Sequence, residues 1–117
     1  MTDPDYLPQS GDLVWTIFDP RTGREQSGFR PALVLSSSVL YQASEIAIVC
    51  PITTKVRRYG SSVLLPDGLP IHGEILTSHI RSIDTKARPF RFAGAAVPPD
   101  CLAEVRAKLA GLCGIGQ

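Results

Sequence analysis

Hydrophobic and polar positions alternate in several short segments of the chain, a pattern typical of β-strands. The segment Asp12 to Phe18 (DLVWTIF) is rich in aromatic and β-branched residues, and Arg30 to Ser36 (RPALVLS) is similar, so both predict strands. Because Pro31 has no N–H, we expect it at the start of its strand or on a sheet edge. Residues 19–29, between the two strands, combine Gly, Pro and charged residues, which predicts a loop.

The next apolar segment, Glu45 to Ile52 (EIAIVCPI), is almost continuous, which predicts a strand buried on both faces. Shorter elements complete the middle of the chain. We expect one helical turn at Val39–Ala43 and short strands at Ser62–Leu65, Gly73–Thr77, His79–Asp84 and Phe90–Val97.

One clear helix is predicted, over residues 98–113. Pro98, Pro99 and Asp100 are residue types that favour a helix start. The residues after them form one apolar stripe at helical spacing, made of Leu102, Val105, Leu109 and Leu112. Many short strands followed by one helix predict a mostly β fold, a barrel or a strongly curled sheet with the helix packed on it.

Composition adds limits to this picture. A chain of 117 residues with 44% hydrophobic and 20% charged residues suits one globular domain, here residues 1–117 with an irregular lead-in over 1–10. No apolar run is long enough to span a bilayer, and the acidic start is unlike a signal or transit peptide. The three cysteines and two histidines lack metal-site spacing, so we expect no metal ion and buried, reduced thiols in a cytosolic protein.

The formal net charge of +1 argues against a protein that coats nucleic acid by bulk electrostatics. The charge is unevenly distributed, however. Residues 1–20 carry four acids and no base, whereas residues 51–92 carry seven bases and three acids. A local anionic partner therefore fits the middle of the chain.

Three groups of residues could carry chemistry. The loop before and including Arg30 holds Arg21 and Arg24, whose guanidinium groups match phosphate oxygens, and Glu25, a possible proton acceptor. The alternative is a solvated surface loop. The second group follows a buried strand and consists of Thr53, Thr54, Lys55, Arg57 and Arg58. Its hydroxyls suit either a phosphate or the capping of the chain's own backbone.

The third candidate is His79, because histidine is a residue type that commonly serves as an acid or a base. The alternative is that it has a structural or surface role in its strand. No single one of these candidates identifies a function without the others.

The ordered string Gly11 to Ser36 (GDLVWTIFDPRTGREQSGFRPALVLS) strongly resembles the opening of the MazF/PemK/Kid family of toxin ribonucleases. The resemblance continues through Cys50–Thr54 (CPITT) and Ile80–Asp84 (IRSID) and covers the C-terminal helix, so it spans nearly the whole chain from about Tyr6. It implies an SH3-like β-barrel or a strongly twisted antiparallel sheet with a C-terminal helix.

The resemblance also implies a function. Members are homodimeric endoribonucleases that cut single-stranded mRNA at short sequences without a metal ion or other cofactor, and so inhibit translation and growth. They act in the bacterial cytoplasm and are neutralised by a MazE-like antitoxin with an acidic C-terminal segment. The runner-up is a non-nucleolytic SH3-like binding module, or a toxin of the same fold that poisons gyrase.

The resemblance further assigns residues. Arg30 and Thr53 correspond to the catalytic pair, and Glu25 is a third catalytic member. RNA-binding roles are expected at Arg21, Arg24, Gln26, Thr54, Lys55, Arg57, Arg58, His79 and Arg81. This chain departs from the family pattern at Ser78-His79, where many members carry Asp-Gln. Either Glu25 supplies the base, or His79 has taken a new role, or base recognition differs.

Overall fold

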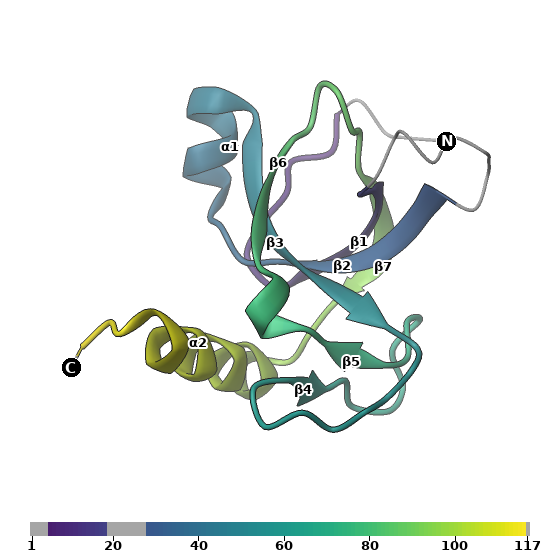
Figure 1. Cartoon of the computed structure of the whole chain (residues 1–117). Coiled ribbons are helices and arrows are strands. Elements are labelled where there is room, and N and C mark those ends of the chain that lie inside the picture. Colours follow the sequence, from purple (N-terminus) through teal and green to yellow (C-terminus); the bar gives the residue numbers. More distant parts are fainter. Residues whose placement is uncertain (1–4, 19–27, 117) are drawn as a thin grey trace.

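The computed structural model describes residues 5–18 and 28–116 (Figure 1). The order of elements is β1 (Asp12–Ile17), β2 (Phe29–Val34), α1 (Ser38–Ser44), β3 (Ile46–Thr53), β4 (Val63–Leu64), β5 (Glu74–Ile75), the 3₁₀ helix η2 (Thr77–His79), β6 (Arg81–Asp84), β7 (Arg91–Ala96) and α2 (Pro99–Cys113). The predicted strands and helices are confirmed to within a few residues, except at His79. This residue ends η2, and the strand expected to begin there starts at Arg81.

The strands form one antiparallel sheet in the order β4-β5-β3-β2-β1-β7, with β6 paired to β3 outside this path. Val49 of β3 pairs with Val34 of β2 and also with Arg81 of β6, so β2 and β6 lie on opposite edges of β3. β5 lies on the same edge of β3 as β6, opposite β2, and pairs there with the last two residues of β3. β5, η2 and β6 therefore act as one interrupted strand along β3.

The sheet curls into half of a barrel, with α2 packed against it (Figure 1). Because side chains alternate along a strand, the sheet contributes to two hydrophobic clusters. One cluster is shared with the start of α2 and includes Leu13, Leu33, Cys50, Ile52, Ile75, Val97, Cys101 and Val105. The other consists of Val14, Ala32, Val34, Ala47, Val49, Ile83 and Phe90. β3 supplies residues to both clusters, which confirms the prediction that both of its faces are buried.

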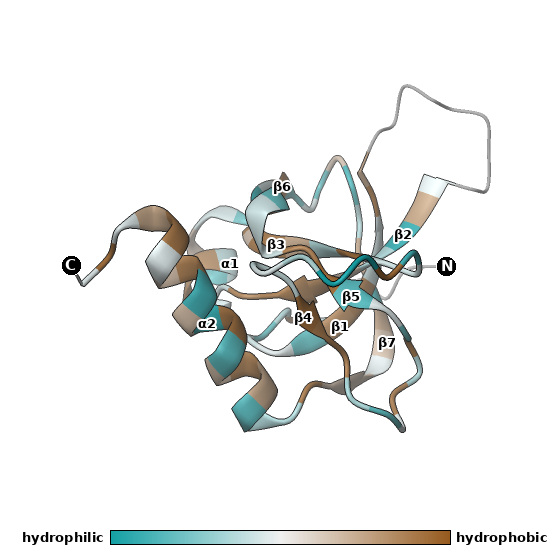
Figure 2. Cartoon of the chain, turned by 60° about the horizontal axis from the view of Figure 1, so that its bottom comes forward, coloured by the Kyte–Doolittle hydropathy of each residue, from teal (hydrophilic) through white to brown (hydrophobic). Residues whose placement is uncertain are grey.

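The C-terminal helix is less buried than its apolar stripe predicts. Val105 is fully buried and Leu109 partly buried, whereas Leu112 is 53% exposed. Hydrophobic and hydrophilic residues alternate along this helix (Figure 2). The next residue, Cys113, is also exposed, so the expectation of a buried thiol is wrong there and right for Cys50 and Cys101.

Candidate functional site

A cavity of about 580 Å³ lies where β2 and β3 stop pairing. The ladder between them contains Ala32–Val34 of β2, with Ala32 opposite Pro51. If the same register continued, the two residues that precede Ala32, Pro31 and Arg30, would lie opposite Ile52 and Thr53. Pro31 has no N–H with which to extend the ladder, so the ladder ends at this point.

Arg30 and Thr53 therefore occupy opposing positions just beyond the last strand pair, and both line the cavity. On its other edge, Arg30 is paired to Thr16 of β1. Thr16 is fully buried and its hydroxyl donates a hydrogen bond of 3.3 Å to the Arg88 carbonyl. Pro31 does not lie on a sheet edge, because β2 is a central strand between β1 and β3, so that part of the prediction is wrong. Pro31 is the third residue of β2, near the start of the strand, as the other part predicts.

The end of β3 is held by β5. Thr53 pairs with Glu74, the first residue of β5. Gly73 precedes it at a φ of +135°, a conformation that L side chains rarely adopt. A Cβ at Gly73 would overlap the Thr53 carbonyl oxygen and would lie 2.9 Å from the Thr53 carbonyl carbon. Only glycine permits this close approach, which fixes the backbone that presents Thr53 to the cavity.

The Thr53 hydroxyl accepts a hydrogen bond of 3.1 Å from the Lys55 N–H. This is the backbone-capping role expected as the alternative to phosphate binding. The two roles are compatible, because the bond uses a lone pair of the hydroxyl oxygen and not its proton. The hydroxyl can therefore donate to an oxygen atom inside the cavity.

The cavity is cationic. The described residues that line it include Arg30, Lys55 and Arg81, together with His79 and no acid. The guanidinium carbon of Arg81 lies 5.3 Å from the ring centroid of Phe18, a cation–π arrangement that orients the charge at the rim. Such a set of donors suits an anionic ligand with several oxygen atoms.

Six of the sequence-predicted site residues thus meet around one cavity: Arg30, Thr53, Thr54, Lys55, His79 and Arg81. Four others, Arg21, Arg24, Glu25 and Gln26, lie outside the described residues. Arg57 and Arg58 are exposed but do not line the cavity. Their loop, residues 54–62, is called the basic loop below.

Sequence reasoning missed the role of Glu74, which it counted only as one of three acids in the basic middle of the chain. The side chain is 1% exposed. One carboxylate oxygen accepts a hydrogen bond of 2.9 Å from the Arg57 N–H, and the other accepts one from the Ser62 hydroxyl. The hydrogen bond from the Ser62 hydroxyl, followed by that from the Arg57 N–H, lowers the pKa of Glu74 below its usual value. An acid within the apolar string GEIL was the available signal.

Within the described residues, no three His, Cys, Asp or Glu side chains cluster closely enough to hold a metal ion. Neither of the described α-helices combines the length and hydropathy that a membrane crossing requires.

The chain is similar to known proteins over most of its length. The family model for the PemK-like, MazF-like toxin of type II toxin–antitoxin system matches residues 9–112. The endoribonuclease toxin MazF of Escherichia coli (strain K12) is 36% identical over 109 residues, which cover 93% of this chain and 96% of that protein. The endoribonuclease toxin ChpB of the same organism is 40% identical over 94 residues, covering 75% and 79%. A chain in the crystal structure of MazE-MazF (Form-III) from Deinococcus radiodurans matches with a TM-score of 0.86 and 40% identity, covering 95% of this chain and 100% of that one.

Proposed function

Because the chain belongs to the family of PemK-like, MazF-like toxins of type II toxin–antitoxin systems, we propose that it is a toxin that cleaves single-stranded mRNA. The observation that carries the proposal is the placement of Arg30 opposite Thr53 in a cationic cavity. A guanidinium and a hydroxyl that line the same cavity beyond the end of the strand pair suit a phosphate group bound in it.

The proposed reaction uses the RNA's own nucleophile. The 2′-hydroxyl loses its proton to a base and its oxygen attacks the adjacent phosphorus. The bond from phosphorus to the 5′-oxygen breaks, and the 5′-oxygen takes up a proton from water or an acid. The products end in a 2′,3′-cyclic phosphate and a 5′-hydroxyl. Alignment of two groups in one molecule lowers such a barrier by about 7–11 kcal/mol in well-oriented cases. The protein therefore needs no nucleophile of its own, and we expect no metal ion to be required.

Arg30 stabilises the negative charge that develops on the phosphate oxygens in the transition state. A guanidinium is by its chemistry a poor proton donor, so the role of Arg30 is electrostatic. Thr53 donates its hydroxyl proton to a phosphate oxygen while the Lys55 N–H holds the hydroxyl in place. Glu25 accepts the proton of the 2′-hydroxyl in this proposal, and His79, which lines the cavity, is the alternative base.

The proposed partners follow from the same site. Single-stranded RNA lies along the cavity and contacts Lys55 and Arg81 through phosphates. A MazE-like antitoxin with an acidic C-terminal segment would place carboxylates on the same cations. The solved MazE-MazF complex of the relative from Deinococcus radiodurans supports such a partner. We further propose that the chain acts as a homodimer in the bacterial cytoplasm.

Incubation of the purified protein with a long, sequence-diverse RNA in EDTA tests the proposal, with both new RNA ends mapped. We expect cleavage with the stated ends. Arg30→Ala should abolish cleavage and leave the fold intact. Arg30→Lys should recover only part of it, because an ammonium lacks the planar fork of donors. Lys86→Ala is the matched control, since Lys86 is 72% exposed and does not line the cavity.

Three outcomes would contradict the proposal or its residue assignment. Intact RNA across all sequences would exclude the nuclease, and growth arrest on expression with intact RNA would favour a gyrase poison of the same fold. Normal cleavage by Arg30→Ala would exclude the assignment of Arg30.

A further inference from the structure

The basic loop folds around a single buried carboxylate. Glu74 accepts hydrogen bonds from the backbone N–H of Arg57 and the hydroxyl of Ser62. The N–H groups of Arg58 and Tyr59 add smaller effects that also lower its pKa. All of these donors belong to one loop. No lysine or arginine in the described parts of the chain forms an ion pair with Glu74.

The loop backbone has a left-handed residue directly after the Arg57 N–H that is bonded to Glu74. Arg58 has a φ of +55°, a left-handed conformation that is uncommon for residues other than glycine. A left-handed residue turns successive N–H groups toward one point, and such concavities bind anions. Here the anion is the protein's own carboxylate. Because Glu74 accepts a hydrogen bond from the adjacent Arg57 N–H, it helps to hold the left-handed backbone of Arg58.

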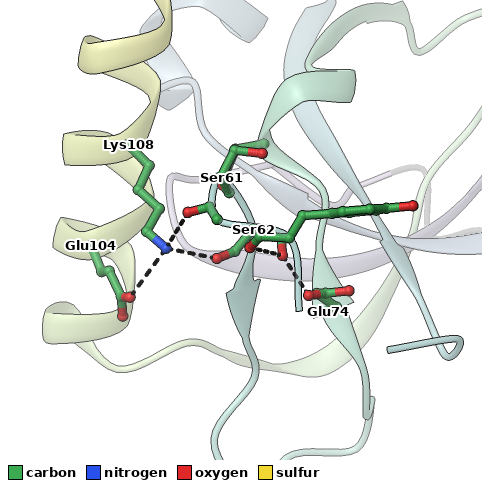
Figure 3. A network of polar contacts seen from close by, with 8 residues as sticks. Ser61, Ser62, Glu74, Glu104 and Lys108 are labelled. Atoms are coloured by element: carbon green, nitrogen blue, oxygen red, sulfur yellow. Dashed lines mark hydrogen bonds and ion pairs between the residues drawn. The ribbon is translucent and has the colours of Figure 1, made fainter. Parts of the chain in front are cut away.

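A lysine holds the same loop from the other side (Figure 3). The Lys108 ammonium on α2 donates hydrogen bonds of 3.0 Å to the Gly60 carbonyl and 2.8 Å to the Ser62 carbonyl. The Thr77 hydroxyl of η2 donates to the Ser61 carbonyl. The carboxylate thus binds the N–H groups of the loop, and the cation and hydroxyl bind its carbonyl groups.

Lys55 lies between two fixed points. Its own N–H is bonded to the Thr53 hydroxyl, and two residues later the Arg57 N–H is bonded to Glu74. The side chain of Lys55 lines the cavity, whereas those of Arg57 and Arg58 are exposed beside it. A cation held at its site loses less conformational entropy on binding than one on a free loop.

We propose that Glu74 is a positioning residue for RNA binding, which holds the basic loop so that Lys55 faces the cavity. The inference rests on the proposed function, since it assumes that the cavity binds RNA. Glu74 touches no RNA and takes no part in the bond changes. Its substitution should therefore weaken RNA binding and leave the rate of the bound complex almost unchanged.

The direct test is Glu74→Gln, with binding measured to a 2′-O-methylated copy of an RNA that the unsubstituted protein cuts. Removal of a negative charge by itself strengthens binding to a polyanion. If Glu74 positions the loop, its substitution should instead weaken RNA binding, by about five- to tenfold. The slope of the logarithm of the binding constant against the logarithm of the salt concentration should fall by about one, as for one lost phosphate contact. The single-turnover rate at saturating RNA should stay within about twofold, because the groups at the phosphate are unchanged.

Glu45→Gln is the matched control, because it removes the same charge from an exposed carboxylate on another part of the chain. It should leave binding unchanged or slightly stronger. Unchanged or stronger binding by folded Glu74→Gln would overturn the inference. Should Glu74→Gln fail to fold, Ser62→Ala removes one donor to the same carboxylate and should weaken binding in the same direction, and unaltered binding by Ser62→Ala would then overturn it.

A double-mutant cycle separates positioning from general damage. In a Lys55→Ala background the loss caused by Glu74→Gln, or by Ser62→Ala, should shrink, because the cation that it positions is gone. Full additivity would contradict the inference. Failure of the proposed function looks different, since the unsubstituted protein would then neither bind nor cut RNA.

Discussion

Replacement of Gly73 by alanine should damage both stability and cleavage. The residue has a φ of +135°, and backbone in sparsely populated regions costs about 1–3 kcal/mol for residues other than glycine. The new methyl group would also overlap the Thr53 carbonyl oxygen. Because the atoms that it meets belong to the backbone, the two strands must move apart, which adds about 1–3 kcal/mol. We expect a total loss of about 2–6 kcal/mol in the free energy of unfolding.

Two other glycines separate these contributions. Gly68 has a φ of +93°, and a methyl group added there would meet nothing within 4 Å, so Gly68→Ala should show the backbone contribution alone. Gly60 has open space and no left-handed φ. Gly60→Ala should be neutral or stabilising by up to about 1 kcal/mol, through the unfolded state.

The assay is thermal and urea unfolding at a fixed protomer concentration, combined with RNA cleavage. At this chain length each kcal/mol corresponds to roughly 4 °C in Tm. A displacement of Thr53 by about 1 Å should lower the cleavage rate by up to about 100-fold. A Gly73→Ala protein that loses no more stability than Gly68→Ala and cuts RNA at the normal rate would refute this expectation.

Three further predictions concern the rest of the chain. Leu33→Ala removes a fully buried side chain and should lower the free energy of unfolding by about 2–5 kcal/mol in urea titrations. In the native protein a maleimide should label Cys113 quickly and Cys50 only on unfolding, because burial raises the pKa of Cys50 to about 12. The stability difference between the unsubstituted protein and Glu74→Gln should shrink as the pH falls below about 4.5. The folded state lowers the pKa of Glu74, so its contribution is present above the unfolded value and lost on acidification.

Each of these three predictions has a control variant or a result that would contradict it. Leu64→Ala, at a side chain that is 41% exposed, should lose clearly less stability than Leu33→Ala. Rapid labelling of more than one thiol in the folded protein would show that the core opens easily. A stability difference that grows on acidification would mean that Glu74 destabilises the folded state as a carboxylate.

Local patterns were sufficient for most strands. DLVWTIF predicts β1 because alternation and β-branched residues act over a few positions, and the register with β2 follows the same alternation. At His79 the local sequence pattern predicts the wrong structure. Its surrounding sequence alternates like a strand, but the preceding Thr77 is buried and bonded to the carbonyl of Ser61. The segment is thus held by a contact across 16 residues, which the local pattern does not contain.

The site was predicted only in part. Resemblance named Arg30 and Thr53, and the structure places both at one cavity. Their catalytic roles, and that of Glu25, stay predictions. The apolar neighbours of Glu74 were the one local signal of its burial. That signal did not reveal its role, because a charged residue is ordinarily exposed and its burial depends on donors in a loop that precedes it by more than ten residues.

Pro31 keeps the cavity open at the expense of one hydrogen bond between β2 and β3. A residue with an N–H at this position could add a rung to the ladder between β2 and β3 and draw Arg30 toward Thr53. Such a variant would gain a backbone hydrogen bond and lose the opening in which a phosphate would lie. The missing donor thus acts as a spacer, and the protein could be inactivated by an additional bond as readily as by the removal of a catalytic group.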